Sequence, residues 1–214
     1  MAIIIVLVAL AAAWILSYLW LNKATVSRVE VQNPEGDAGT ALVVDHPGRG
    51  SFHVQVVSGF VEGLVSSGWR VERTTASRQA PADLSGYDLL VLGSPTYWFT
   101  PSWPIRSYLG RLGDLKGQRT ITLVTGMGAG ERSAALLAKW VRKANGDLAK
   151  GLLFYWMRPN DDDNYVNAEQ NKVLAVQMAT QAARDLSFPG KPAKARDADG
   201  QKESSGAIRG TIDL

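Results

Sequence analysis

The chain has 214 residues and a net charge of +3, a length that suits one ordinary α/β domain with additional segments. It contains no cysteine and only two histidines, which excludes disulfides, thiolate catalysis and cysteine- or histidine-rich metal sites. Its basic residues form no stripe with interleaved aromatic residues, which argues against nucleic-acid binding.

The first segment, Ala2–Leu21, is a continuous apolar run without a charged residue. About 20 helical residues span a hydrocarbon core ~30 Å thick, so we predict a single transmembrane helix that anchors the chain. The alternative is a cleaved signal peptide, but the segment lacks a basic n-region and a clear cleavage site. Lys23 and Arg28 follow the run and no basic side chain precedes it, which predicts a cytoplasmic location for the rest of the chain.

Residues 22–39 are polar and predict a linker, with a short extended piece at Val26–Val31. Residues 40–186 then alternate short apolar strands with amphipathic helices. Strands are expected at Thr40–Asp45, Trp69–Thr74, Leu89–Leu92, Thr120–Thr125 and Leu152–Met157. Helices are expected at Ser51–Ser67, from Ser102 or Trp103 to about Leu112, at Glu131–Ala144 and at Asn171–Leu186, with a looser piece at Ala80–Tyr87. This alternation predicts an α/β domain with a five-stranded parallel sheet, order 2-1-3-4-5, and helices on both faces. Residues 187–214 are polar and poor in large apolar residues, which predicts a disordered tail.

The segment Asp88–Arg111 is the most informative part of the chain. Its apolar strand is expected to end at Gly93 with a turn at Ser94-Pro95, and an aromatic loop then leads into a helix with Pro104 in its first turn. Ligands of open parallel sheets bind just beyond the carboxyl ends of the strands. The exposed aromatic loop therefore predicts a ligand site at this edge.

The loop after the first strand is rich in glycine and leads directly into a helix. Free backbone N–H groups and the helix dipole favour a phosphate there, and an arginine side chain adds a charge-assisted hydrogen bond. The candidate residues are Gly48, Arg49, Gly50, Ser51 and Phe52. The alternative is a tight turn that needs glycine for its backbone angles.

Two further loops are expected beside the first. In the loop after the third strand, Tyr97 and Trp98 suit stacking on a planar ring, next to Pro95 and Thr96. The alternative is that these aromatic residues pack on the neighbouring helix or form a partner surface. The loop after the fourth strand supplies small residues and backbone amides that let a ligand approach closely. Its candidates are Gly126, Met127, Gly128 and Gly130.

The segment GSPTYWFTPSWPIRSYLGRL resembles the second flavin-binding loop of the flavodoxin-like family and the helix that follows it. The flanking segments SGYDLLVLGSP and TLVTGMGAGE are also similar, and the resemblance covers about residues 40–186. It implies that the chain binds FMN, with the phosphate at Gly48–Phe52 and the ring near Tyr97, Trp98 and Gly126–Gly130.

The phosphate loop departs from the family pattern of hydroxyl residues around a glycine, T/S-x-T-G-x-T. Pro47, Arg49 and Phe52 stand where the hydroxyl residues are expected, and only Ser51 remains nearby. Hydrogen bonds to a charged group contribute ~1.5–3 kcal/mol each, so the replacements predict weaker phosphate binding. Arg49 and the backbone amides are expected to restore part of it.

With the predicted anchor, the resemblance implies a membrane-anchored, FMN-dependent oxidoreductase that passes electrons from NAD(P)H to an acceptor. A quinone-like acceptor is expected because the anchor would hold the domain near lipid-soluble molecules. A one-electron carrier for a membrane redox partner and a non-catalytic scaffold with an empty pocket are the alternatives. Neither histidine has an identified partner, and Asp161–Asp163 lacks the spacing of a calcium loop. We therefore assign no catalytic residue and no metal ligand, and the oligomeric state stays open.

Overall fold

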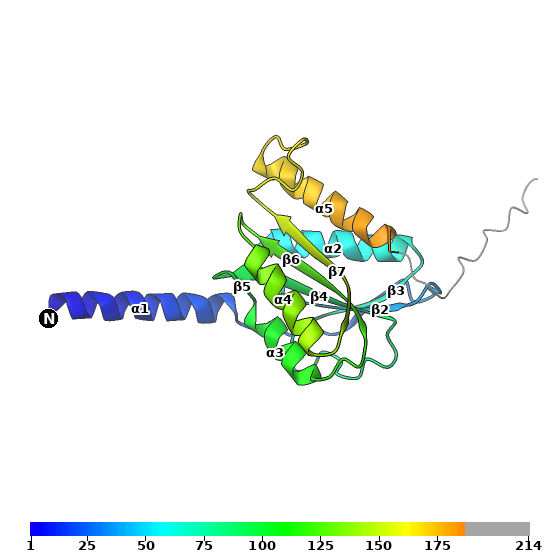
Figure 1. Ribbon diagram of the computed structural model, residues 1–214, viewed down its shortest axis with the longest axis horizontal. Coiled ribbons are helices and arrows are strands. Elements are labelled where there is room, and N and C mark those ends of the chain that lie inside the picture. The colour runs from blue at the N-terminus through cyan, green and yellow to red at the C-terminus, as the bar shows by residue number, and fades with distance from the viewer. Residues whose placement is uncertain (187–214) are drawn as a thin grey trace, which may run out of the picture.

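The computed structural model describes residues 1–186, so the tail predicted at residues 187–214 lies outside the described part of the chain. The helices are α1 (Ala2–Leu21), α2 (Ser51–Ser66), α3 (Trp103–Leu112), α4 (Glu131–Lys143) and α5 (Ala168–Arg184). The strands are β1 (Glu30–Gln32), β2 (Thr40–Asp45), β3 (Arg70–Thr75), β4 (Leu89–Tyr97), β5 (Thr100–Pro101), β6 (Arg119–Gly126) and β7 (Asp147–Tyr155). Figure 1 shows α1 projecting from a layered α/β body.

The strands form one sheet in the order β1-β3-β2-β4-β6-β7, and β5 pairs with β4. The five strands β3, β2, β4, β6 and β7 pair in parallel, which confirms the predicted order 2-1-3-4-5. At one edge, β1 adds an antiparallel strand to β3, with Glu30 opposite Arg73. Part of the predicted linker therefore belongs to the sheet.

Each central strand is buried on both faces because successive side chains point to opposite sides of a sheet. In β2, Val43 faces α2 and α5, whereas Leu42 faces α3 and α4. In β4, Leu89 likewise faces α2 and α5, and Leu90 faces α3 and α4. This alternation explains why these strands read as continuous apolar runs in the sequence.

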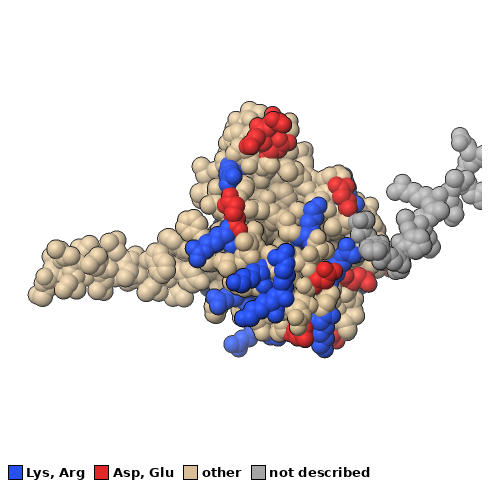
Figure 2. All heavy atoms as spheres, in the orientation of Figure 1, with Lys and Arg blue, Asp and Glu red and all other residues tan. Residues whose placement is uncertain are grey.

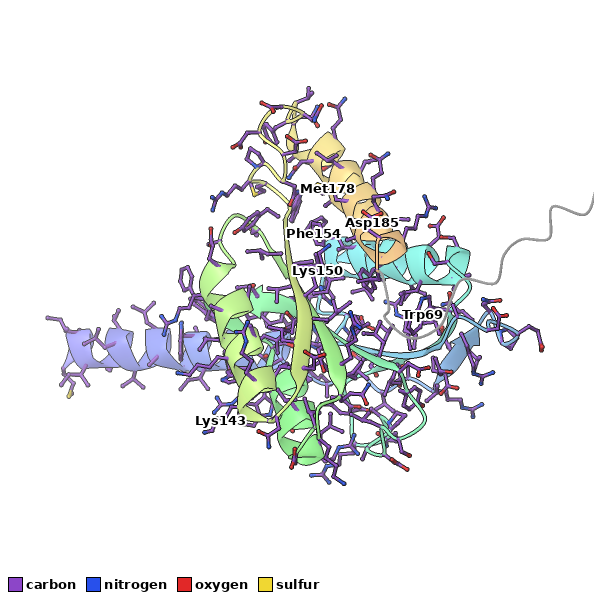
Figure 3. All side chains as sticks on the ribbon, turned by 45° about the vertical axis from the view of Figure 1, so that its right-hand side comes forward. Trp69, Lys143, Lys150, Phe154, Met178 and Asp185 are labelled. Atoms are coloured by element: carbon purple, nitrogen blue, oxygen red, sulfur yellow. The ribbon has the colours of Figure 1, made fainter. Side chains whose placement is uncertain are left out.

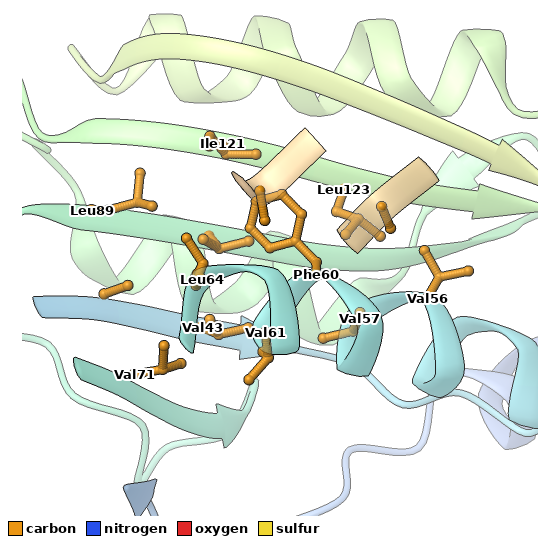
Figure 4. Close-up of a cluster of buried hydrophobic side chains, with 14 of the residues drawn as sticks. Val43, Val56, Val57, Phe60, Val61, Leu64, Val71, Leu89, Ile121 and Leu123 are labelled. Atoms are coloured by element: carbon orange, nitrogen blue, oxygen red, sulfur yellow. The ribbon is translucent and has the colours of Figure 1, made fainter. Parts of the chain in front are cut away.

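One layer consists of α2 and α5, and its core is centred on Phe60 of α2 (Figure 4). Phe154 projects from β7 toward this layer, where Ala175 and Ala179 of α5 leave room for it (Figure 3). The other layer consists of α3, α4 and the loop that contains Ala80, in place of a helix between β3 and β4. Lys and Arg side chains are concentrated over α3 and α4 (Figure 2).

The turn expected at Ser94-Pro95 is wrong, because β4 continues to Tyr97. Ser94 and Pro95 pair with Val124 and Thr125 of β6. On the other side, β2 ends opposite Gly93, so the missing N–H of Pro95 leaves no gap in the ladder. The turn consists of Trp98 and Phe99. The residues on either side of it, Tyr97 of β4 and Thr100 of β5, pair with each other.

Two boundaries near the C-terminal end of the domain also differ from the expected ones. β7 starts five residues earlier than the predicted Leu152 and ends at Tyr155, and α5 starts at Ala168 instead of Asn171. The side chain of Asn167 accepts hydrogen bonds from the N–H groups of Glu169 and Gln170 and so caps α5. Helix starts are set by such caps, which apolar periodicity does not reveal.

Helix α1 is long and apolar enough to cross a membrane, and no residue of it is buried. Its C-terminal end lies against the carboxyl edge of the sheet. The Asn22 side chain accepts a hydrogen bond from the N–H of Trp103 at 2.7 Å, and His46 Nε2 lies 3.3 Å from the carbonyl oxygen of Lys23. These contacts link α1 to the start of α3 and to the loop after β2.

Candidate functional site

A cavity of about 330 Å³ lies at the carboxyl ends of β2, β4 and β6. This is the position at which open parallel sheets bind ligands, and the volume falls within the usual range for ligand pockets. The residues that line it are Pro47, Arg49, Gly50, Ser51, Phe52, His53, Pro95, Thr96, Tyr97, Thr125, Gly126, Met127, Trp156 and Lys172. The three loops that the sequence analysis selected therefore meet around one hollow.

The loop between β2 and α2 forms one wall of the cavity. Gly48 has φ +69°, and a Cβ atom on it would lie 2.5 Å from the phenolic oxygen of Tyr97. Only glycine permits both this backbone conformation and this close approach. Gly50 then precedes α2 without a side-chain cap from the described residues. The first N–H groups of α2 thus face the cavity region without the acceptor that a capping side chain would supply.

Arg49 connects this wall to the N-terminal helix. Its Nε and a terminal guanidinium nitrogen donate to the carbonyl oxygen of Trp20, at 3.1 and 2.7 Å, and the guanidinium lies 4.6 Å from the centre of the Trp20 ring. The bond satisfies a carbonyl at the C-terminal end of α1, where the helix dipole favours a cation. For Arg49 to bind a phosphate, as the sequence predicts, its guanidinium would have to leave this carbonyl.

The opposite wall comes from the end of β7 and from α5. Trp156 directly follows β7, and the Lys172 ammonium lies 4.4 Å from the centre of its ring. Asn171 holds this corner by donating to the carbonyl oxygens of Tyr155, Trp156 and Arg158. The Trp156 ring and the Lys172 ammonium, which also binds the Glu169 carboxylate at 2.8 Å, are therefore held in place at the cavity.

A buried polar cluster lies beneath the cavity. His53 Nδ1 is 2.8 Å from the Thr125 hydroxyl, and His53 Nε2 is 4.0 Å from Asp45 Oδ2. Arg73 binds the same carboxylate, with Nε 3.3 Å from Oδ1, and also donates to Ser58. The Arg73 pair compensates part of the cost of burying Asp45.

Burial determines the protonation of this cluster. Desolvation lowers the pKa of His53 to about 3, so its imidazole is neutral at physiological pH. Desolvation also raises the pKa of Asp45, while the charge of Arg73 opposes that rise. A neutral His53 has one donor and one acceptor nitrogen. Nδ1 bonds to the Thr125 hydroxyl, whereas Nε2 is too far from Asp45, at 4.0 Å, for a hydrogen bond.

Three buried polar atoms that face this region have no hydrogen-bond partner among residues 1–186: His53 Nε2, Thr96 Oγ1 and Trp156 Nε1. An unsatisfied buried polar group costs about 1–3 kcal/mol, and native proteins retain few of them. All three residues line the same cavity. His53 Nε2 is directed toward Asp45, 4.0 Å away, so a polar ligand in the cavity would be a partner for Thr96 Oγ1 and Trp156 Nε1.

Most of the predicted site residues come together at the cavity. Arg49, Gly50, Ser51, Phe52, Pro95, Thr96, Tyr97, Gly126 and Met127 line it. Gly48 lies beneath the Tyr97 hydroxyl, and the N–H of Gly130 donates to its neighbour Glu131 at 3.0 Å. Gly128 lies outside the lining. Trp98 also lies outside it, and its ring centre is 5.4 Å from that of Trp14 in α1. Its role in ring stacking stays a prediction.

Several residues that line the cavity are not among those predicted from the sequence. Trp156 and Lys172 were not selected, although Trp156 follows the fifth parallel strand and the same edge rule applies to it. His53 was noted without a partner, and its partners Thr125 and Asp45 lie on two different strands. Only strand order brings these side chains together.

Comparison with solved structures decides the fold family. NAD(P)H:quinone oxidoreductase from Methanothermobacter marburgensis aligns with a TM-score of 0.54 at 15% identity, over 73% of this chain and 100% of that one. Azoreductase from Bacillus anthracis str. Sterne aligns with a TM-score of 0.53 at 12% identity, over 69% and 99%. Flavodoxin 1 from Bacillus cereus aligns with a TM-score of 0.51 at 12% identity, over 69% and 99%.

The fold is flavodoxin-like. At these identities the similarity establishes the flavodoxin-like fold alone. No protein-family model matches the chain, and no curated protein matches it by sequence.

Proposed function

We propose that this flavodoxin-like protein binds FMN in the cavity at the carboxyl edge of the sheet and transfers electrons from NAD(P)H to a quinone-like acceptor. The observation that carries the proposal is the pair of polar atoms without a partner among the described residues, on Thr96 and Trp156, in one cavity at an uncapped helix start. These features together fit a ligand that has both a phosphate and a flat ring with polar edges.

The residues of the cavity fit the two ends of FMN. The N–H groups at the start of α2, after Gly50, would hold the phosphate, although Pro47, Arg49 and Phe52 supply no hydroxyl groups there. Tyr97 and Trp156 would flank the ring, and the Thr96 hydroxyl would bind a polar group on its edge. Gly126 and Met127 complete the rim.

Bound FMN would supply the electron-transfer chemistry, whereas the chain binds and orients it and excludes water. Arg49 at the rim would attract the phosphates of NAD(P)H, whereas the charge of Lys172 is already paired with Glu169. The name of one structural neighbour, an NAD(P)H:quinone oxidoreductase, supports this donor and acceptor class.

We propose further that α1 anchors the protein in a membrane as a single span, with the flavodoxin-like domain in the cytoplasm. The span has no charged residue, and Lys23 and Arg28 lie on its C-terminal side. An anchored domain would remain close to lipid-soluble acceptors.

The first test is the visible absorption spectrum of the full chain, purified in detergent, with and without added FMN. We expect shifted flavin bands and saturable binding. Thr96→Val removes the unpaired hydroxyl at almost constant volume and should weaken FMN binding about 10-fold, which corresponds to ~1.4 kcal/mol. Thr180→Val in α5, whose hydroxyl bonds the Val176 carbonyl away from the cavity, is the matched control. A colourless protein that takes up no FMN would refute the proposal.

The second test is steady-state oxidation of NADH and of NADPH by the FMN-loaded protein, with and without a quinone. Quinone-dependent oxidation is the expected result. If the loaded protein accepts electrons only from another reduced protein, it is a carrier and not an oxidoreductase.

A further inference from the structure

The turn between β4 and β5 carries two bulky aromatic residues in a conformation that suits neither. Trp98 has φ +51° and Phe99 has φ +61°, and Tyr97 pairs directly with Thr100 across the turn. Positive φ at both central residues is the requirement of a type I′ hairpin turn, in which Asn-Gly is strongly preferred. Backbone strain of this kind persists where it serves a function.

Burial of the two side chains within the domain does not offset the backbone strain. Trp98 remains 47% exposed and Phe99 58% exposed. Neither residue lines the cavity. Among the described residues, the ring contact at this turn is the one between Trp98 and Trp14 of α1.

The contact between Trp98 and Trp14 fixes the position of the turn along the axis of α1. Trp14 lies seven residues before Leu21, the last residue of α1, which corresponds to ~10 Å along the helix axis. If α1 spans a hydrocarbon core ~30 Å thick and Leu21 lies at its edge, a side chain at this level lies ~10 Å inside that edge, among the acyl chains. The turn follows α1 into that layer.

The surroundings of the turn also fit a membrane surface. Trp103 at the start of α3 is 52% exposed, and the Arg106 guanidinium lies 5.6 Å from its ring centre. Tryptophan rings and cations are the groups that settle at the level of lipid headgroups. The start of α3 lies beside the end of α1, since the N–H of Trp103 donates to Asn22 (Figure 1).

We propose that the turn Trp98–Phe99 inserts into the bilayer beside α1, so that the cavity opens at the lipid surface. The proposal rests on the membrane anchoring proposed above for α1. The inserted residues have a physical reason to be aromatic, because lipid contact offsets the strain that an aqueous turn would avoid with Asn-Gly. Arg49 joins the two parts, since it lines the cavity and binds the end of α1.

The test uses the absence of cysteine in the chain, which allows a single spin label without further substitutions. Phe99→Cys is labelled in the full protein, reconstituted in phosphatidylcholine vesicles. Its immersion depth is measured by relaxation with oxygen and with a water-soluble nickel chelate. We expect a label about 5–10 Å below the headgroup level.

Two control labels separate the possible failures. Leu10→Cys near the middle of α1 should be immersed, and Gly86→Cys, before the opposite end of β4 with no neighbour around its Cβ position, should remain in water. An aqueous label at Phe99 with an immersed label at Leu10 would overturn insertion of the turn and leave the anchor intact. An aqueous label at Leu10 would overturn both. FMN binding is read separately from the absorption spectrum.

Phe99→Gly tests the strain argument without labels. Glycine is the preferred residue at this turn position, so the melting temperature in detergent should rise by about 2–4 °C. A melting temperature that falls would show that Phe99 stabilises the domain itself, which contradicts a role in lipid contact.

Discussion

The phenolic oxygen of Tyr97 lies over Gly48 so closely that a Cβ atom there would come within 2.5 Å of it. One residue belongs to the loop after β2 and the other to the end of β4, so the contact joins two of the three loops around the cavity. Burial raises the pKa of Tyr97, so the phenol remains protonated here at physiological pH.

Gly48→Ala is expected to weaken FMN binding. Alanine is strained at φ +69° by about 1–2 kcal/mol and also clashes with Tyr97, so the free loop should relax away from the binding conformation. Restoring that conformation on binding should raise the Kd by a factor of about 5–30. Titration followed by absorbance measures this value. Gly86→Ala, which has open space around it, should leave the Kd unchanged.

Trp156→Phe should separate ligand binding from stability. It removes a buried indole N–H that lacks a partner among the described residues, so the free energy of unfolding without FMN should change by less than ~1 kcal/mol. The Kd for FMN should nevertheless rise about 10-fold because the ligand loses that donor. Trp140→Phe, on α4 with Arg106 over its ring, is the control for the loss of an indole. Unchanged binding in Trp156→Phe would remove this residue from the site.

Arg73→Ala should destabilise the domain by about 3–5 kcal/mol, because it leaves the buried Asp45 carboxylate unpaired. Adding Asp45→Asn should recover most of the loss. Burial already raises the pKa of Asp45 in the folded state, so its contribution to stability is complete at low pH and is lost as the pH rises through the folded pKa.

Arg73→Ala should therefore also change how the free energy of unfolding depends on pH. Arg73 opposes the raised pKa of Asp45, so its removal should raise that pKa further and extend the fall in the free energy of unfolding to higher pH, starting above the ordinary aspartate pKa of 3.8. Urea denaturation across this range measures the slope. If the slope of Arg73→Ala equals that of Arg73→Ala/Asp45→Asn, Asp45 is not the titrating group.

Gly63→Ala tests the contact between α2 and α5. A Cβ atom at Gly63 would meet the carbonyl oxygen of Thr180 and the Cβ atom of Ala183. Overpacking of this kind typically costs about 1–3 kcal/mol, to be measured by denaturant unfolding. Gly110→Ala on α3 meets no neighbour and should instead stabilise the protein by about 0.5–1 kcal/mol. Stabilisation by both substitutions would contradict the close approach of the two helices.

The strand order and the edge that carries the cavity could be predicted from the sequence. Continuous apolar runs such as Leu89–Leu92 require a strand buried on both faces, and right-handed crossovers then leave few arrangements. Because parallel strands end at the same edge, the loops around Gly50, Tyr97 and Gly126 had to be neighbours.

The length of β4 could not be predicted in the same way. Gly93, Ser94 and Pro95 suggest a turn when they are read locally, but pairing with β6 keeps them extended. The turn therefore moves to Trp98, which the tertiary structure places against Trp14 instead of in the cavity lining.

The sequence by itself determined the fold class, the sheet order and the edge at which a ligand would bind, because these follow from short-range periodicity and from the handedness of crossovers. Tertiary structure alone decided which side chains face that ligand. His53 contacts Thr125, which is 72 residues away in the sequence, and Arg49 donates to a carbonyl at the end of α1, 29 residues away. The charge and shape of a side chain are local properties, whereas its partner depends on which distant segments the packed sheet brings within reach.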